Sequence, residues 1–209
     1  MESLSIILDA TGEPVSVGEI REHLRIDSTR EDRLLESYTK AAVSYGENHT
    51  KRDFMEKTRK LVLDNFKTII ELPRPPLSTA ASNVLIEYTN TTGGAGICVK
   101  SSISTCNYVV DYNSEPGRII LGYGYTWPDV QPIKNAVQIT YKTGYANDTV
   151  SSNVTTPEPI KQWIKVRVGQ MHQFREPVIV GETLRYMRRD FVDGMLDPYL
   201  IISHESGQI

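Results

Sequence analysis

The chain has 209 residues, of which 39% are hydrophobic and 23% charged, and its net charge is −3. This length allows one domain with a real core, or one domain that carries a sizeable insertion. A protein that grips DNA through its phosphates usually has a basic excess, which this chain lacks, so we expect nearby DNA to slide past rather than be held. A local basic patch is still possible at this net charge, because net charge does not show how charges are distributed over the surface.

The sequence carries no signal for export or membrane insertion. Residues 1–8 lack the basic start and long apolar stretch of a signal peptide. No stretch approaches eighteen apolar residues, so no transmembrane helix is expected. We therefore expect the protein in the cytoplasm, or in a particle assembled there, without a membrane partner.

Two capping boxes predict the first two helices. Ser16 with Glu19, and Ser28 with Glu31, each place a hydroxyl three residues before a carboxylate. We expect helices over about 17–24 and 29–48, the second with an apolar stripe at helical spacing. That stripe consists of Leu34, Leu35, Tyr38, Ala41, Ala42 and Tyr45, and the other face carries Arg30, Arg33, Glu36, Lys40 and Glu47.

Between residues 54 and 145 the pattern changes to short runs of β-branched and aromatic residues separated by turns. Pro73, Pro75 and Pro76 end one run, because proline cannot donate to a central strand ladder. Strands are expected at 61–63, 69–72, 84–88, 108–112, 118–121 and 136–141, with turns at 93–96 and 115–117. The pattern predicts a small antiparallel β-unit inserted between helices.

Helical spacing returns after a polar loop. Thr156 can cap a helix over about 158–174, whose first turn tolerates Pro157 and Pro159. A turn around Gly181, a short helix over about 186–195 and a mobile polar tail over 203–209 follow. We therefore expect an α+β fold in a single domain, 1–209, whose mainly α-helical core (16–52 and 157–200) carries a β-insertion (54–145).

Motifs for common chemistries are missing. The sequence has no phosphate-binding loop, no nucleophile elbow and no paired zinc histidines. Its four histidines, His23, His49, His172 and His204, lack a partner at the spacing of a helical metal pair. We expect no catalytic residue, no metal and no cofactor, and hence no enzyme.

Two other pairs of residues that could carry chemistry are more simply explained as structural. Cys98 and Cys106 can form one bridge, but two small buried or facing strand residues are favoured. Asp111 and Glu115 would need burial or close pairing to become an acid and a base, which sequence cannot reveal.

An aromatic cluster of Tyr123, Tyr125 and Trp127 follows. Such clusters can stack on nucleic-acid bases, but the usual interleaved cations are missing here. Packing or subunit contact is the favoured role, since Tyr and Trp are enriched at interfaces.

Several strings, in order, resemble one family: the head–tail connector, or head completion, proteins of tailed phages and related gene-transfer particles. The order and spacing of these strings match that family over roughly residues 16–200. They are VGEIREHLRID (17–27) with Glu31-Asp32 and Leu34-Leu35, ELPRPPL (71–77), YVVD (108–111), SEPGRI (114–119), Trp127-Pro128, Asn135-Ala136-Val137, Thr140-Tyr141, Thr143-Gly144-Tyr145, PIKQ (159–162), Arg175-Glu176 and LDPY (196–199).

The resemblance implies a structural ring protein of the virion, at the head–tail junction. Its subunits would form a ring, dodecameric in this family, beneath the portal, and extend the channel through which genomic DNA passes without specific binding. The implied partners are copies of itself, the portal protein and the next tail component, a stopper or tail-terminator protein. Another neck or tail-completion protein, or a nucleic-acid-binding module, stays as the alternative.

Two surfaces are candidates for these contacts. The charged face of the long helix would meet neighbouring subunits or the channel, through Arg30, Arg33, Glu36, Lys40 and Glu47. The segment from about residue 184 would dock on the portal, through Arg185, Arg188, Arg189, Phe191, Leu196 and Tyr199. The open alternative for this segment is a terminal helix packed on its own domain.

Overall fold

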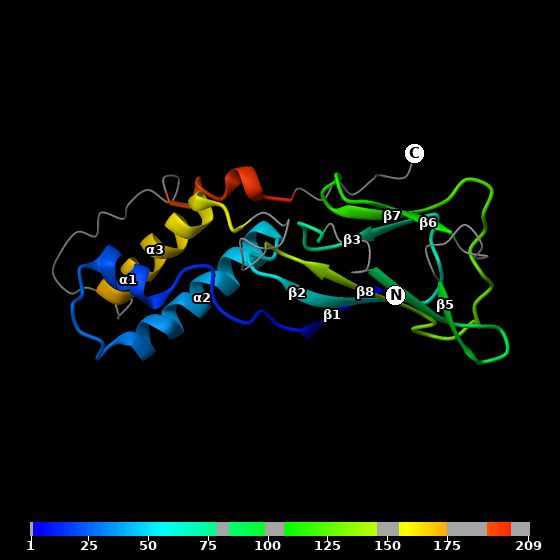
Figure 1. Ribbon diagram of the computed structural model, residues 1–209, viewed down its shortest axis with the longest axis horizontal. Coiled ribbons are helices and arrows are strands. Elements are labelled where there is room, and N and C mark those ends of the chain that lie inside the picture. Colours follow the sequence, from blue (N-terminus) through cyan, green and yellow to red (C-terminus); the bar gives the residue numbers. More distant parts are fainter. Residues whose placement is uncertain (1, 79–83, 99–106, 146–154, 175–191, 202–209) are drawn as a thin grey trace.

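The computed structural model describes residues 2–78, 84–98, 107–145, 155–174 and 192–201. These residues form an elongated molecule with helices at one end and strands at the other, which we call the helical lobe and the β lobe (Figure 1). In chain order the elements are β1 (Glu2–Leu8), α1 (Val17–Leu24), α2 (Asp32–Thr50), β2 (Lys57–Leu63), β3 (Ile69–Leu72), β4 (Val84–Thr89), β5 (Ala95–Cys98), β6 (Tyr108–Asp111), β7 (Gly117–Leu121), β8 (Val137–Thr143), α3 (Glu158–Gln173) and a 3-10 helix (Asp197–Tyr199).

One of the two predicted capping boxes is present. The Ser16 hydroxyl accepts from the Glu19 backbone N–H at 3.2 Å, and the Glu19 carboxylate accepts from the Ser16 N–H at 2.8 Å, so α1 begins as expected. The second box is wrong. Helix α2 begins at Asp32, and the Ser28 hydroxyl accepts from Arg30 N–H in a turn before the helix.

The buried face of α2 differs from the predicted stripe. Tyr45 is 47% exposed, whereas Gly46 and Glu47 are buried. A Cβ at Gly46 would lie 2.6 Å from the Phe54 ring and 2.9 Å from the Trp163 ring. Two large aromatic rings thus occupy the space that a side chain would need, and this close approach decides which face of α2 turns inward.

The third helix is confirmed with bounds within one residue of the prediction, and Ile160, Trp163, Ile164 and Val168 are its buried residues. Thr156 does not cap it. Its hydroxyl instead donates to the Phe54 carbonyl at 2.8 Å, and Pro157 stands at the N-cap. Most of the predicted helix at 186–195, and the predicted tail at 203–209, lie outside the described residues.

The β lobe consists of two antiparallel sheets. One has five strands in the order β1-β2-β8-β4-β5, and the other has three in the order β3-β7-β6. Burial alternates along β8, where Val137, Ile139, Tyr141 and Thr143 face inward. This period-two pattern is what one buried sheet face requires.

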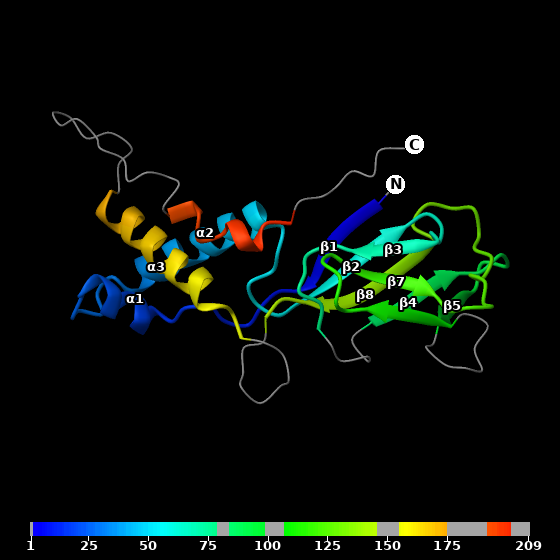
Figure 2. The ribbon, with the colours of Figure 1, turned by 90° about the horizontal axis from the view of Figure 1, so that it is seen from above.

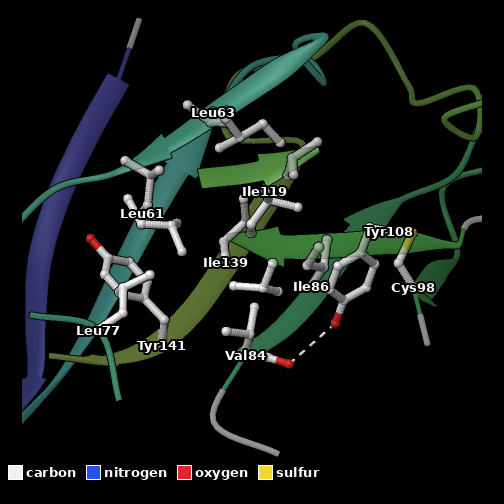
Figure 3. Packing of buried hydrophobic residues seen from close by; sticks show 14 residues of the cluster. Leu61, Leu63, Leu77, Val84, Ile86, Cys98, Tyr108, Ile119, Ile139 and Tyr141 are labelled. Carbon is white, nitrogen blue, oxygen red and sulfur yellow. Dashed lines mark hydrogen bonds between the residues drawn. The ribbon is translucent and has the colours of Figure 1, made fainter. Parts of the chain in front are cut away.

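The inner faces of the two sheets share one hydrophobic core (Figure 3). Ile86 and Ile139 of the larger sheet and Ile119 of the smaller sheet are each fully buried. Each such side chain contributes about 1.5–3 kcal/mol by leaving water. A separate cluster, which includes Leu35, Trp163 and Leu196, fills the helical lobe.

The prediction of a mainly helical core is therefore wrong. Among the described residues, three α-helices stand beside eight strands, and the strands bury a core of their own. The β lobe is also not built from the middle of the chain alone, because β1 pairs with β2 from before α1. Figure 2 shows the same separation of helices and strands from above.

Candidate functional site: the interlobe junction and the exposed surfaces

A cluster of buried charges lies where α2 leads into β2. Asp53 is 0% exposed, and its carboxylate accepts two hydrogen bonds from Arg59, each 2.6 Å long. The Thr143 hydroxyl donates to the same carboxylate at 2.5 Å. Burial alone would lower the pKa of Arg59, but the hydrogen bonds and charge of Asp53 raise it above its ordinary value. Arg59 thus stays charged inside the fold, and each partner of the contact depends on the other.

A second pair lies one turn before the end of α2. The Glu47 carboxylate accepts from the Phe54 N–H at 2.9 Å and from the Lys57 ammonium at 2.8 Å. Burial raises the pKa of Glu47 despite these two donors. Glu47 therefore joins α2 to the first residues of the β lobe.

The proline-rich exit from β3 closes this junction. Arg74, with φ +69°, donates to the Glu47 carbonyl at 2.6 Å. Asp53 N–H donates to the Pro75 carbonyl at 3.2 Å, and Gly144 N–H to the Pro76 carbonyl at 2.8 Å. The strings 71–77 and 143–145, which carry part of the family resemblance, thus meet at one place in the fold.

Arg52 adds a third contact to the junction. Its Nε donates to the Tyr199 carbonyl at 2.6 Å, and its two terminal nitrogens donate to the Glu115 carboxylate. The Arg52 hydrogen bonds and charge lower the pKa of Glu115, against the opposing effect of burial. The junction therefore reaches the β6–β7 turn and the C-terminal segment as well.

The predicted interface residues of α2 do not share one environment. Arg30, Arg33, Glu36 and Lys40 are exposed. Glu47 is 6% exposed and is engaged inside the subunit. Four of the five side chains are thus available to a neighbour or a channel, and Glu47 is not.

The predicted docking residues are only partly described. Leu196 is 0% exposed in the core of the helical lobe, and Tyr199 packs against that core with part of its surface free. Arg185, Arg188, Arg189 and Phe191 lie outside the described residues. Leu196 therefore anchors its segment to the subunit in this structure.

Sequence reasoning missed two exposed apolar surfaces of the β lobe. Ile69, Ile120 and Val109 lie side by side on the outer face of the three-stranded sheet and are 47%, 38% and 53% exposed. On the edge strand β1, Ile6, Ile7 and Leu8 are 46%, 54% and 61% exposed. The sequence did contain a signal for the first surface. Adjacent residues of a strand face opposite sides, so each isoleucine pair, 69–70 and 119–120, must place one side chain on the outer face of the sheet.

The other residues that the sequence analysis considered for chemistry have local structural roles. Asp111 accepts from the Asn113 N–H at 2.9 Å, which fixes the β6–β7 turn. His172 Nε2 lies 2.8 Å from the Glu31 carboxylate and joins α3 to the start of α2. Cys98 is buried, as the favoured interpretation expects, and it is disulfide-bonded, which the sequence left open. Cys106 lies outside the described residues.

The aromatic cluster is divided. The Trp127 ring stacks on Phe66 at 4.6 Å between ring centroids, and its Nε1 donates to the Lys67 carbonyl at 2.9 Å. Tyr123 stands at the corner of a turn closed by a hydrogen bond from Tyr125 N–H to the Gly122 carbonyl, and it is fully exposed. Trp127 thus packs within the subunit, and Tyr123 presents its ring to solvent.

Within the ranges that the structure describes, no three His, Cys, Asp or Glu side chains are grouped as metal ligands would be. None of the helices described there has the length and apolar character needed to span a membrane.

Comparison with known proteins bears on the family. The family model of "Phage gp6-like head-tail connector protein" matches residues 15–105. The predicted resemblance to the head–tail connector family is confirmed. The match runs from the approach to α1 through β5, so it takes in α2 and the first side of the interlobe junction.

Solved structures share the fold of nearly the whole chain. A chain of the neck of an empty gene transfer agent (GTA) particle, computed with C6 symmetry, has a TM-score of 0.74 at 18% identity, covering 99% of this chain and 100% of that chain. A chain of the native GTA virion has a TM-score of 0.70 at 18% identity, covering 98% of both chains. A chain of the native GTA neck, computed with C12 symmetry, has a TM-score of 0.70 at 17% identity, covering 99% of this chain and 100% of that chain.

At these identities the likeness establishes the shared fold. No curated protein matches the sequence. The family model thus matches residues 15–105, and the solved GTA chains share the fold over nearly the whole chain.

Proposed function

We propose that this protein is a structural ring subunit of the neck, which joins the portal of a filled head to the tail and extends the DNA channel. The observation that carries the proposal is the connector-family match over residues 15–105 within a chain whose whole fold is that of GTA neck proteins. The proposal includes no reaction and no cofactor. It places the protein in the virion, at the head–tail junction, after assembly in the host cytoplasm.

The proposed ring has heterologous contacts, because a closed ring needs two different patches on each subunit. We assign one patch to the exposed charges just before and along the first turns of α2, namely Arg30, Arg33, Glu36 and Lys40. The two exposed apolar surfaces of the β lobe support contact with other subunits, since exposed apolar patches commonly mark interaction sites. A mildly acidic protein, with a net charge of −3, would let DNA pass without holding it.

The ring is tested by the mass of the purified protein. Light scattering over a concentration series, with negative-stain images of the same fractions, is expected to give a species of about twelve subunits. A subunit has a mass of 23.6 kDa. If the protein stays monomeric, the test moves to the portal, on which the ring would then assemble. A monomer that also fails to bind the portal contradicts the proposal.

We further propose that the segment from residue 184 docks on the portal through Arg185, Arg188, Arg189, Phe191 and Tyr199. Deletion of the segment is a poor test, because Val192 and Leu196 belong to the core of the helical lobe. Reversing the three arginines to glutamate is expected to weaken portal binding about tenfold or more, since opposed charges across an interface become like charges. Surface plasmon resonance on the cognate portal protein measures this change.

The matched control carries the same change in charge elsewhere. Reversal of Arg30, which lies just before α2, together with Arg33 and Lys40 is expected to abolish self-association and to leave portal binding by the single subunit intact. Equal loss of portal binding in both triple variants would contradict the docking assignment. Salt-dependent DNA affinity in the parent, with a slope of several units, would favour a nucleic-acid-binding module instead.

A further inference from the structure

The Arg52 guanidinium brings together three distant parts of the chain. Its side chain is 7% exposed. Its Nε donates to the Tyr199 carbonyl at 2.6 Å, 147 residues away, and Nη1 donates to Glu115 Oε1 at 2.8 Å, 63 residues away. Nη2 donates to the other Glu115 oxygen, so the carboxylate holds the guanidinium in a two-point contact.

The segment 192–201 lies along the helical lobe (Figure 1, red). Val192 and Leu196 insert into the core, and Asp193 accepts from Trp163 Nε1 at 3.4 Å. At the far end, Ile201 N–H donates to the Thr50 carbonyl at 3.1 Å. Between these points the 3-10 helix ends at Tyr199, and Arg52 satisfies the carbonyl that this end leaves free.

Glu115 belongs to the β lobe and is the more accessible partner. Its side chain is 45% exposed, against 7% for Arg52. A buried guanidinium without a counter-charge is strongly unfavourable, so loss of the Glu115 charge would drive Arg52 toward water. Arg52 cannot make that movement and keep its hydrogen bond to the Tyr199 carbonyl.

We propose that Glu115 and Arg52 form a latch through which the β lobe holds the C-terminal segment 192–201 against the helical lobe. The latch is a property of the single subunit. If this segment also docks on the portal, which rests on the proposed function, contacts made by the β lobe would affect whether the segment is held against the helical lobe or released for docking.

Hydrogen exchange in the isolated subunit, followed by mass spectrometry, tests the latch. Glu115→Gln keeps the size of the side chain and removes its charge. The peptide containing Leu200 and Ile201 is expected to exchange about tenfold faster, since a hydrogen bond to a charged group is lost. Peptides from α3 are expected to keep their rates.

The control is Glu71→Gln, which removes a charge of the same kind from the same lobe. Glu71 lies 3.6 Å from Arg118, far along the chain from the segment, and its side chain is 59% exposed. It is expected to leave exchange at 200–201 unchanged. Unchanged exchange in Glu115→Gln, or equal acceleration in α3, would overturn the proposal.

A double-mutant cycle separates a latch from two independent contacts. Arg52→Lys keeps the charge but lacks the fork that reaches both partners. The double variant Arg52→Lys/Glu115→Gln is expected to exchange no faster than Arg52→Lys alone, because both changes break one chain of contacts. Effects that multiply would show that the two residues act separately. None of these measurements requires a ring or a portal, so their outcome is independent of the assembly tests.

Discussion

Replacing Asp53 with asparagine is expected to lower the free energy of unfolding by about 3–5 kcal/mol, because the change leaves Arg59 charged and buried without its partner. Asp53 is 0% exposed and receives two 2.6 Å hydrogen bonds from Arg59. Denaturation by urea, followed by tryptophan fluorescence, measures the loss. Trp163 lies in the helical lobe and Trp127 in the β lobe, so the signal reports on both.

The matched control for this variant is Asp129→Asn on the exposed surface, which is expected to change stability by less than about 0.5 kcal/mol. A second comparison uses Asp53→Asn/Arg59→Leu, which removes both charges. Its loss is expected to be smaller than the sum of the two single losses. Additive losses would mean that the buried pair does not act as a unit, contrary to the geometry of the junction.

Replacing Gly144 with alanine is expected to be similarly destabilising. Gly144 has φ +93°, and a Cβ there would lie 1.9 Å from the Met55 carbonyl oxygen. The left-handed backbone alone costs about 1–2 kcal/mol for a residue with a Cβ. The overlap with the backbone adds about 1–3 kcal/mol, because the β2 and β8 ends must move apart. Thermal and urea denaturation measure the total.

Gly124 provides a control, because it has a similar left-handed backbone conformation but open space where a Cβ would stand. Its φ is +81°, and no atom lies within 4 Å of where a Cβ would stand. Gly124→Ala is expected to cost only the backbone component, about 1–2 kcal/mol. Equal losses in the two variants would show that the contact with Met55 does not limit the packing of the junction.

The sequence predicted the elements whose signals are local. Helix α1 follows from one capping box, and α3 follows from proline in its first turn and apolar residues at helical spacing. The strands at 69–72, 108–111 and 117–121 follow from β-branched and aromatic runs between turns. In each case the sequence signal comes from residues a few positions apart along the chain.

The failures concern one local turn and several contacts between residues farther apart along the chain. Ser28 could cap a helix as Ser16 does, but the backbone before α2 turns instead. Glu47 lies on the charged face of a helical wheel, yet Phe54 and Lys57 bury it. Strand β1 was missed because its burial is slight and its partner β2 comes after both helices.

Among the candidate surface residues, too, the sequence predicted what depends on local pattern and missed what depends on contacts between distant segments. Exposure of Arg30, Arg33, Glu36 and Lys40 agrees with their place opposite an apolar stripe. The role of Leu196 as an anchor, and the meeting of Arg52 with Glu115 and Tyr199, depend on chain segments up to 147 residues apart.

By itself, then, the sequence determined the three described helices and most strands, because backbone propensity, capping and periodicity act over short distances. The resemblance to head–tail connectors rested instead on short strings and their order along the chain. Only the tertiary structure decided that strands form a lobe with its own core and that a buried ionic junction joins it to the helices. The energy of those features comes from desolvation and pairing between residues that sequence order keeps apart, and these terms exist only once the chain is folded.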